Sequence, residues 1–435
     1  MKVCVLGLWH LGSVTAACLA RLGHEVVGCD ADQDVVTGLL QDRPPVGEPG
    51  LPELIQQQRD EKRLSFTTDL SEALRSAQVI WVTYDTPVDE DDRADVDFVI
   101  SSVERTFPYL DDGTVVLISS QLPVGSTKEL ERRWAHVSNG RNVRFAYSPE
   151  NLRLGKAMDG FLSPDRIVVG LRDPAEPEGS ALRLTELFGA LADRIVWMGV
   201  ESAEMTKHAV NAFLATSVTF INEVARLCEA VGADAGEVER GLKTEARIGP
   251  KAYLGPGAAF AGGTLARDVR FLRSIGTQYR KATPFFDGLA ESNAQHRSWT
   301  IDRLESTLGA LRGHRIAVWG LTYKAGTTTL RRSDAVVLCH HLLKRGATVL
   351  AHDPTVMTPL AEFDPVIETS GDPIQTATLA DALVVATGWP QYRDVPSERL
   401  FAALRRPVVV DANRFLGATI GADGRFEYFS VGRRH

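Results

Sequence analysis

Residues 1–30 alternate between two kinds of apolar pattern, and this alternation constrains the fold more than any other feature of the chain. A strand-like run at 3–6 leads into a turn that begins with Gly7 and ends with Gly12. A helix-like segment at 14–21 follows, and a second strand-like run occupies 25–30. Strand, glycine turn, helix and strand in this order are typical of a βαβ unit in a parallel sheet.

The turn carries part of a dinucleotide-binding fingerprint. In such a turn the first glycine bends the chain, the second lets the backbone approach the pyrophosphate, and the third lets the helix pack closely. Here Gly7 and Gly12 supply the first and third, whereas Trp9 takes the place of the second. The full turn, which we predict to bind the cofactor, reads Gly7, Leu8, Trp9, His10, Leu11 and Gly12.

Asp30 indicates which cofactor the turn serves. It ends the second strand, 23 residues after Gly7, where a carboxylate can bond both ribose hydroxyls. The same carboxylate would repel a 2′-phosphate, so NAD is favoured over NADP. The alternative is an α/β domain with an empty nucleotide cleft.

The rest of the chain repeats the strand-and-helix theme around a long helix. Further strand-like runs lie at 78–83, 114–118, 144–146 and 166–169, and a similar series begins with 315–319 followed by Gly320. We therefore predict an α/β protein with two Rossmann-like, doubly wound parallel-sheet domains. The expected parts are an NAD-binding domain at 1–200, a central helical domain at 201–300 and a second Rossmann-like domain at 312–435.

The central helix is expected at about 202–231. Its apolar residues recur at helical spacing, and such a helix often pairs with a copy of itself, so we predict a homodimer. The residues are Met205, Ala209, Phe213, Phe220, Val224 and Leu227.

Composition and charge exclude several classes of protein. The net charge of −8, with both signs scattered, argues against nucleic acid as a partner. No apolar run approaches the ~18 residues needed to cross a bilayer, and Met1 and Lys2 lead directly into the first strand. The five cysteines form no CxxC pair and no metal-ligand spacing, so we expect reduced, buried thiols, no metal and a cytoplasmic location.

Several separated motifs, in order along the chain, resemble the UDP-glucose/GDP-mannose (nucleotide-sugar) dehydrogenase family. Glu48-Pro49-Gly50-Leu51 matches the family's E-P-G-L, and Thr86-Pro87 matches its T-P. Residues 120–127 are similar to S-T-V-P-V-G-T-T, with Gln121 in place of the first Thr, and 149–155 to P-E-F-L-R-E-G. Later matches are Lys207, Asn211, Arg247, the glycines from Gly249 to Gly257, Asp268, Tyr323-Lys324, Arg331 and Arg414.

The resemblance implies an activity, a nucleotide-sugar-binding role for the C-terminal domain at 312–435, and a set of binding residues. The family oxidises the primary alcohol at C6 of a nucleotide-linked hexose to a carboxylate, in two hydride transfers to NAD. By their place in its motifs, Thr86, Pro87, Gln121 and Arg331 are expected to bind the cofactor. Those expected to bind the nucleotide sugar are Leu152, Arg247, Tyr253, Gly257, Tyr323, Lys324 and Arg414.

The expected catalytic groups are of two kinds, those that contact the reacting oxygen and those that hold water or act as a base. Lys207 and Asn211 stand four residues apart on one predicted helix, so both can point at the reacting oxygen. Glu150 and Asp268 are carboxylates that can hold a water molecule or act as a base.

The family's thiol is missing from this sequence. Where the family has G-G-x-C-x-P-K-D, residues 261–268 contain no cysteine. Counting back from Asp268 puts Thr264 at the cysteine position, whereas counting forward from the glycine pair puts Leu265 there. A hydroxyl is a far weaker nucleophile than a thiolate, so the thioester route to the acid is expected to be closed.

Four outcomes remain open from the sequence. The enzyme can release the C6 aldehyde, oxidise the hydrated aldehyde to the uronic acid, or reduce the aldehyde again after exchange at C5, which would make it an epimerase. The fourth, from another class, is an inactive paralogue that only binds nucleotide sugars. Hydride transfer to NAD separates it from an active dehydrogenase.

Overall fold

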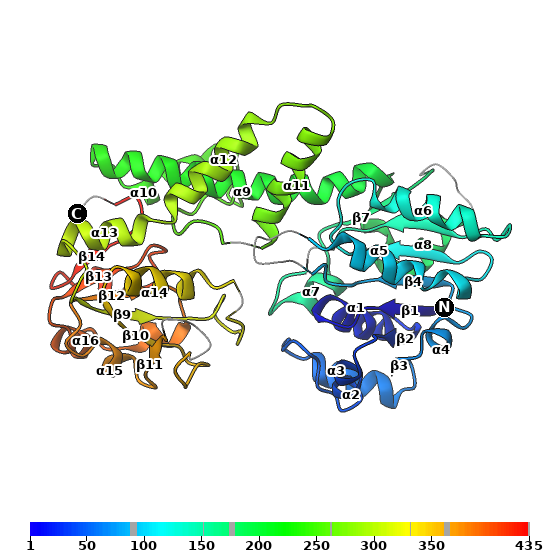
Figure 1. Cartoon of the computed structure of the whole chain (residues 1–435), viewed down its shortest axis with the longest axis horizontal. Coiled ribbons are helices and arrows are strands. Elements are labelled where there is room, and N and C mark those ends of the chain that lie inside the picture. The colour runs from blue at the N-terminus through cyan, green and yellow to red at the C-terminus, as the bar shows by residue number, and fades with distance from the viewer. Residues whose placement is uncertain are drawn as a thin grey trace. The chain divides into compact units, whose positions relative to one another are not determined.

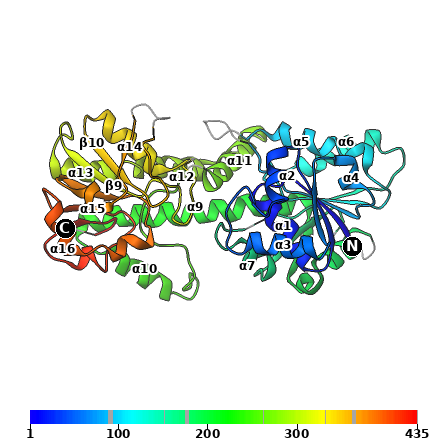
Figure 2. The same cartoon turned by 90° about the horizontal axis from the view of Figure 1, so that it is seen from below.

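The computed structural model describes residues 1–87, 94–150, 152–173, 179–261, 263–330, 332–360 and 366–433. The chain divides into two compact units, Met1–Ala209 and Val210–His435 (Figure 1). The division falls inside α9 (Val200–Val231), one continuous helix of 32 residues (Figure 2). The predicted domain limits at 1–200, 201–300 and 312–435 stay a prediction.

The first unit is built on an eight-stranded sheet with the order β3-β2-β1-β4-β5-β6-β7-β8. Strands β1 to β6 are parallel, as predicted. The sheet then reverses, because β7 meets β6 antiparallel at Tyr147 and Gly170, a change of direction that the sequence pattern did not predict. The strands are β1 Lys2–Leu6, β2 Glu25–Cys29, β3 Leu64–Thr67, β4 Val79–Val82, β5 Val115–Ile118, β6 Arg144–Tyr147, β7 Ile167–Leu171 and β8 Ile195–Gly199.

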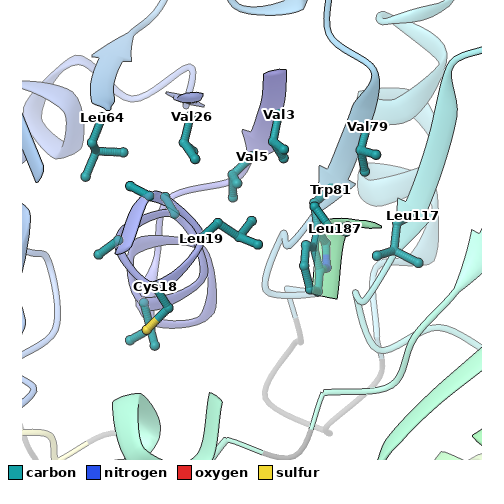
Figure 3. Packing of buried hydrophobic residues seen from close by; sticks show 14 of the residues in the cluster. Val3, Val5, Cys18, Leu19, Val26, Leu64, Val79, Trp81, Leu117 and Leu187 are labelled. Atoms are coloured by element: carbon teal, nitrogen blue, oxygen red, sulfur yellow. The ribbon is translucent and has the colours of Figure 1, made fainter. Parts of the chain in front are cut away.

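Both faces of this sheet are buried at its centre, which explains why β4 and β5 are apolar throughout. Val3 and Val5 of β1 belong to one core cluster, and Leu19 of α1 packs in the same cluster (Figure 3). Cys4 and Leu6 point to the other face and belong to a second cluster. Side chains alternate between faces along a strand, so a strand covered on both sides needs no polar positions.

Helices cover both faces of this sheet. The helices on the Val3 face are α1 His10–Arg21, α2 Gln33–Leu39, α3 Leu51–Asp60, α7 Ala157–Leu162 and α8 Ser180–Phe188. Those on the Cys4 face are α4 Leu70–Leu74, α5 Val96–Glu104 and α6 Ser126–Val137, together with the start of α9. Two 3₁₀ turns, η1 Phe107–Tyr109 and η2 Gly189–Arg194, complete the unit.

The second unit contains a six-stranded sheet with the order β11-β10-β9-β12-β13-β14, in which every pairing is parallel. The strands are β9 Arg315–Trp319, β10 Thr348–His352, β11 Glu368–Thr369, β12 Ala382–Val385, β13 Val408–Val410 and β14 Glu427–Phe429. The helices are α10 Ala235–Thr244, α11 Thr264–Gln278, α12 Pro284–His296, α13 Trp299–Leu308, α14 Asp334–Lys344, α15 Pro373–Ala377 and α16 Ser397–Ala403, with the 3₁₀ turns η3 Pro390–Asp394 and η4 Ile420–Ala422. The structure thus confirms the predicted α/β class with two Rossmann-like sheets and a long joining helix.

The two sheets begin with the same turn. Gly7 and Gly320 both follow the first strand at positive φ, 87° and 89°, a conformation that glycine adopts without strain. The amide of Gly7 bonds the carbonyl of Cys29 at 3.0 Å, and that of Gly320 bonds the carbonyl of His352 at 2.7 Å. Each turn therefore closes on the end of the neighbouring strand in the same way.

Among the described residues, no helix combines the length and the apolar character needed to cross a membrane.

Candidate active site

The glycine turn of the first unit has the geometry of a dinucleotide cradle. A Cβ on Gly7 would lie 2.6 Å from the Tyr84 ring, and one on Gly12 would lie 1.8 Å from the carbonyl oxygen of Gly7. Both positions therefore require glycine, because a side chain at Gly7 would clash with Tyr84 and one at Gly12 would clash with the backbone of Gly7. The N-terminus of α1, with its free amides, opens directly after this turn, as pyrophosphate binding requires.

Trp9 occupies the second fingerprint position without distorting the turn. Its φ of −69° and ψ of −154° are extended values that any residue adopts, so this position does not need glycine. The side chain is 48% exposed. The next two residues, His10 and Leu11, are half-buried at the start of α1.

Replacing Trp9 with glycine is expected to change the dissociation constant for NAD by no more than about threefold. The backbone at this position already has the conformation that the turn needs, and about half of the Trp9 surface is in solvent. Titration calorimetry with NAD measures the constant directly. If the variant binds NAD tenfold more tightly or more, the indole obstructs the pyrophosphate and this interpretation of the turn is wrong.

Asp30 stands at the carboxyl end of β2, where the sequence placed it. Its Oδ2 accepts the amide of Leu8 at 2.6 Å, and its Oδ1 accepts the amide of Asp32 at 3.0 Å. Each carboxylate oxygen has a second lone pair, so these bonds orient the group and still leave acceptors for ribose hydroxyls. The turn and the carboxylate together fit a bound NAD.

Two loops at the ends of β4 and β5 are tied together beside this turn. Thr86 is buried, and its Oγ1 donates to the carbonyl of Gln121 at 2.8 Å. Pro87 follows Thr86, and Gln121 is half-buried. The last predicted cofactor residue, Arg331, lies outside the described residues.

Lys207 on α9 lies against the segment that follows β6. Only 7% of its side chain is exposed, and its Nζ donates to the backbone carbonyl of Glu150 at 2.5 Å and lies 3.9 Å from the Glu150 carboxylate. That carboxylate in turn accepts the amide of Leu152 at 2.6 Å. Leu152 itself is half-buried against the core of the first unit. The structure thus brings three of the predicted site residues together.

Asn211, one helical turn after Lys207 on α9, bonds the second predicted carboxylate. Its Nδ2 donates to Oδ2 of Asp268, which is fully buried on α11. Thr264 is the first residue of α11 and is exposed, one helical turn before Asp268. Leu265 packs instead against the apolar cluster around Ala212. Of the two positions that we expected to correspond to the family's cysteine, Thr264 is therefore the one that solvent and small molecules can reach.

All five cysteines are reduced and buried. Burial raises the pKa of Cys339 to about 12, and burial also raises that of Cys18 to about 12. The sequence has no cysteine between Cys228 and Cys339, the segment that contains Thr264. None of these five thiols has the exposure of a nucleophilic cysteine.

The loop before Thr264 is held by buried side chains, and sequence reasoning missed two of them, Asn293 and His296. Asn293 bonds both the amide and the carbonyl of Phe260 at 3.0 Å. His296 bonds the carbonyl of Gly257 at 2.8 Å, and burial lowers the pKa of this imidazole. Asn222 accepts the amide of Gly257 at 3.0 Å. A paired donor and acceptor facing one peptide fixes a loop firmly, but the partners lie far apart in sequence and leave no local motif.

Most of the predicted substrate residues are exposed. Arg247 is 88% exposed and bonds the neighbouring Glu245 at 2.9 Å, and Lys324 lies in an exposed turn. Tyr253 and Tyr323 also present much of their surface to solvent, although partial burial raises the pKa of Tyr323. The contact of these four residues with substrate stays a prediction, as do the predicted roles of the cofactor-binding and catalytic residues.

Arg414 has a different setting from the one we expected. Its guanidinium bonds the Asp234 carboxylate at 3.1 Å and the carbonyl of Val431 at 3.3 Å, so it ties the start of α10 to the C-terminal segment. Burial alone would raise the pKa of Asp234, but the bonds from Arg414 and from the Gly236 amide lower it overall. These contacts engage the guanidinium structurally, so a role with substrate stays a prediction.

No cluster of three or more His, Cys, Asp or Glu side chains suited to a metal ion occurs in the described parts of the chain.

Family models match nearly the whole chain. Residues 1–190 match the NAD binding domain of the UDP-glucose/GDP-mannose dehydrogenase family. Residues 201–295 match its central domain, and 317–418 match its UDP binding domain.

Individual relatives agree with these matches. A UDP-glucose 6-dehydrogenase of Pseudomonas aeruginosa is 33% identical over 445 residues, covering 100% of this chain and 98% of the relative. One from Rhizobium meliloti is 32% identical over 438 residues, with 100% of both chains covered. Among solved structures, a UDP-glucose dehydrogenase from Pyrobaculum islandicum superposes with a TM-score of 0.88 at 29% identity, covering 100% of this chain and 98% of the other.

Proposed function

Because this chain belongs to the UDP-glucose/GDP-mannose dehydrogenase family of NAD-dependent oxidoreductases, we propose that it oxidises the C6 primary alcohol of a nucleotide sugar, most directly a UDP-hexose, and that the usual thioester route beyond the aldehyde is closed. The observation that carries the first half is the polar face of α9, where Lys207 and Asn211 are both buried and both bonded. The UDP binding domain matched at 317–418 supports the choice of nucleotide.

The chain's own groups divide the work of the first oxidation. Bound NAD supplies the hydride acceptor. Lys207, fixed by the Glu150 carbonyl, accepts the alcohol proton, and Asn211 uses its second amide hydrogen to bond the substrate oxygen while its first bonds Asp268. The alcohol loses one hydride and one proton and becomes the aldehyde.

The reaction stops at the aldehyde because of the residue at the start of α11, Thr264. A thiolate there would add to the aldehyde and make the second hydride transfer lead to a thioester. Thr264 offers a hydroxyl whose ionisation lies far from neutral pH, so the addition is slow. Glu150 and Asp268 can hold a water molecule, which leaves slow oxidation of the hydrated aldehyde as a minor course.

The proposal is tested with a panel of UDP-, GDP-, CDP- and ADP-hexoses incubated with the protein and NAD in heavy water, followed by mass spectrometry. We expect NADH and a product two mass units lighter than the sugar. A product at the mass of the acid would overturn the closed thioester route. Deuterium at carbon without net NADH would mean epimerisation, and sugar binding with no reaction would mean an inactive paralogue.

Introducing a thiol at Thr264 should open the second oxidation. In Thr264→Cys the thiol would stand at the N-terminus of α11, whose partial positive charge lowers thiol pKa values, so we expect two NADH per sugar instead of one. The stoichiometry is read from NADH absorbance at limiting substrate. Leu265→Cys is the matched control, because that side chain packs in the Ala212 cluster and should leave the ratio at one. A ratio already at two in the unmodified protein would contradict the proposal.

We also propose that a second copy of the chain covers an exposed stripe on α9. Phe213, Phe220, Leu227 and Val231 are 71%, 49%, 67% and 76% exposed and fall on one side of the helix at spacings of seven, seven and four. The double variant Phe213→Asp/Leu227→Asp is expected to sediment as a monomer in analytical ultracentrifugation, while the unmodified chain sediments as a dimer. Phe285→Asp, at an exposed aromatic on α12, is the control and should remain dimeric. A monomeric unmodified chain would refute this proposal.

A further inference from the structure

A buried carboxylate joins the glycine turn to the segment that holds Lys207. Glu48 precedes α3 and is 5% exposed. Its Oε2 lies 3.0 Å from Nε2 of His10 and accepts the amide of Gly155 at 2.8 Å, while its Oε1 accepts the amide of Ala157 at 2.7 Å. One side chain therefore bonds two segments more than 100 residues apart in sequence.

The three partners of Glu48 belong to two parts of the proposed site, one for the cofactor and one for the reacting alcohol. His10 is the first residue of α1 and belongs to the turn that fits NAD. Gly155 and Ala157 follow Glu150, whose carbonyl accepts the bond from Lys207. The position of Gly155 is constrained further by its φ of 83°, so its amide points where the carboxylate can accept it.

We propose that Glu48 is a positioning residue that holds the cofactor turn and the backbone at Gly155 and Ala157 in register, so that NAD and the reacting alcohol are each bound in the productive arrangement. This inference rests on the proposed function and adds to it a residue that touches neither ligand. A buried carboxylate without donors costs free energy, and so does a buried donor without an acceptor. The bonds between Glu48 and its three donors therefore stabilise both sides of the contact. Loss of this acceptor frees both segments at once.

The first test is Glu48→Gln, which keeps the shape but replaces one acceptor oxygen with an NH₂ group that cannot accept. Hydrogen–deuterium exchange of the full chain should show the amides of Gly155 and Ala157 exchanging about tenfold faster. Calorimetry should show about tenfold weaker NAD binding, and kcat/KM for the UDP-hexose should fall by at least as much. Glu53→Gln, at an exposed carboxylate on α3, is the matched control and should change none of these.

Substitutions of His10 separate the bond between Glu48 and His10 from the bonds between Glu48 and the amides of Gly155 and Ala157. His10→Leu removes only the bond on the cofactor side, so NAD should bind about tenfold more weakly while Gly155 and Ala157 stay protected from exchange. His10→Gln places an amide donor near the position of Nε2 and should restore most of the affinity. This pair keeps the test informative if Glu48→Gln does not fold.

Two results would overturn the inference. One is unchanged exchange at both amides in Glu48→Gln. The other is faster exchange with NAD and sugar affinities equal to those of the unmodified protein, which would make Glu48 structural only. Exchange and NAD calorimetry require no sugar oxidation, so a chain that oxidises no sugar yet shows both changes would refute the proposed function and leave the positioning role standing.

Discussion

Replacing Lys207 with alanine is expected to lower kcat for oxidation of a UDP-hexose by ~10²–10⁴-fold and to leave the NAD dissociation constant within about threefold of its original value. The side chain is 7% exposed and its Nζ is fixed by the carbonyl of Glu150, so it is held in place for proton transfer. Among the described residues, those of the turn at 7–12 make no hydrogen bond or ion pair with the Lys207 side chain. Stopped-flow NADH absorbance measures the rate, and calorimetry measures the cofactor affinity.

Lys207→Arg distinguishes proton transfer from simple charge. Arginine keeps the positive charge but does not release its proton in proteins, so it should not restore kcat if Lys207 acts as the base. Lys128→Ala, at an exposed lysine on α6, is the control and should retain full activity. An active Lys207→Ala enzyme would remove Lys207 from the catalytic set, whereas an active Lys207→Arg would reduce its role to electrostatics.

The fold was predictable where apolar patterns are local and strong. The glycine turn and its flanking strands were found because Gly7 and Gly12 are required by close contacts that every such turn shares. Short strands without a continuous apolar run, such as β3 Leu64–Thr67 and β14 Glu427–Phe429, were missed because their pattern is indistinguishable from a loop. The reversal at β7 was missed as well, since strand direction depends on the path of the connection and not on the strand's own residues.

The candidate catalytic residues could be predicted from the sequence, whereas most of the residues that hold them in place could not. Asn211 and Asp268 were both expected and are bonded to each other. Glu48 was recognised only as part of a motif, because its partners at 155 and 157 become neighbours through the fold alone. Arg414 was expected to contact the substrate. In the structure its guanidinium bonds Asp234, a contact that no sequence motif indicated, and its contact with substrate stays a prediction.

Asp353 closes the second glycine turn in the way that Asp30 closes the first, but its carboxylate has no capacity left for a ligand. Its Oδ2 accepts the amides of Leu321 and Thr322, the hydroxyl of Thr322 and the indole NH of Trp389, at 2.8 to 3.0 Å. Its Oδ1 accepts the amide and the hydroxyl of Thr355 at 3.0 and 2.9 Å. The group is fully buried, so six donors depend on one side chain.

Asp353→Ala is therefore expected to destabilise the C-terminal sheet by ~4 kcal/mol or more, because each buried donor left without a partner costs ~1–3 kcal/mol. Asp353→Asn should cost about half as much, since it keeps one acceptor oxygen. Urea denaturation followed by circular dichroism measures both losses. Asp394→Ala, at an exposed aspartate of η3, should change stability by no more than ~0.5 kcal/mol.

The pH dependence of this loss identifies the charged form as the stabilising one. Burial alone would raise the pKa of Asp353, but the bonds from Thr322, Thr355 and Leu321 hold it below its usual value. A lowered folded-state pKa means that the contribution is complete above the unfolded pKa of about 3.9 and is lost as pH falls through the lower folded value. The difference in unfolding free energy between the unmodified protein and Asp353→Asn should therefore be constant from pH 7 to 5 and shrink below pH 4. A difference that persists undiminished in acid would show that the six donors need the shape of the side chain and not its charge.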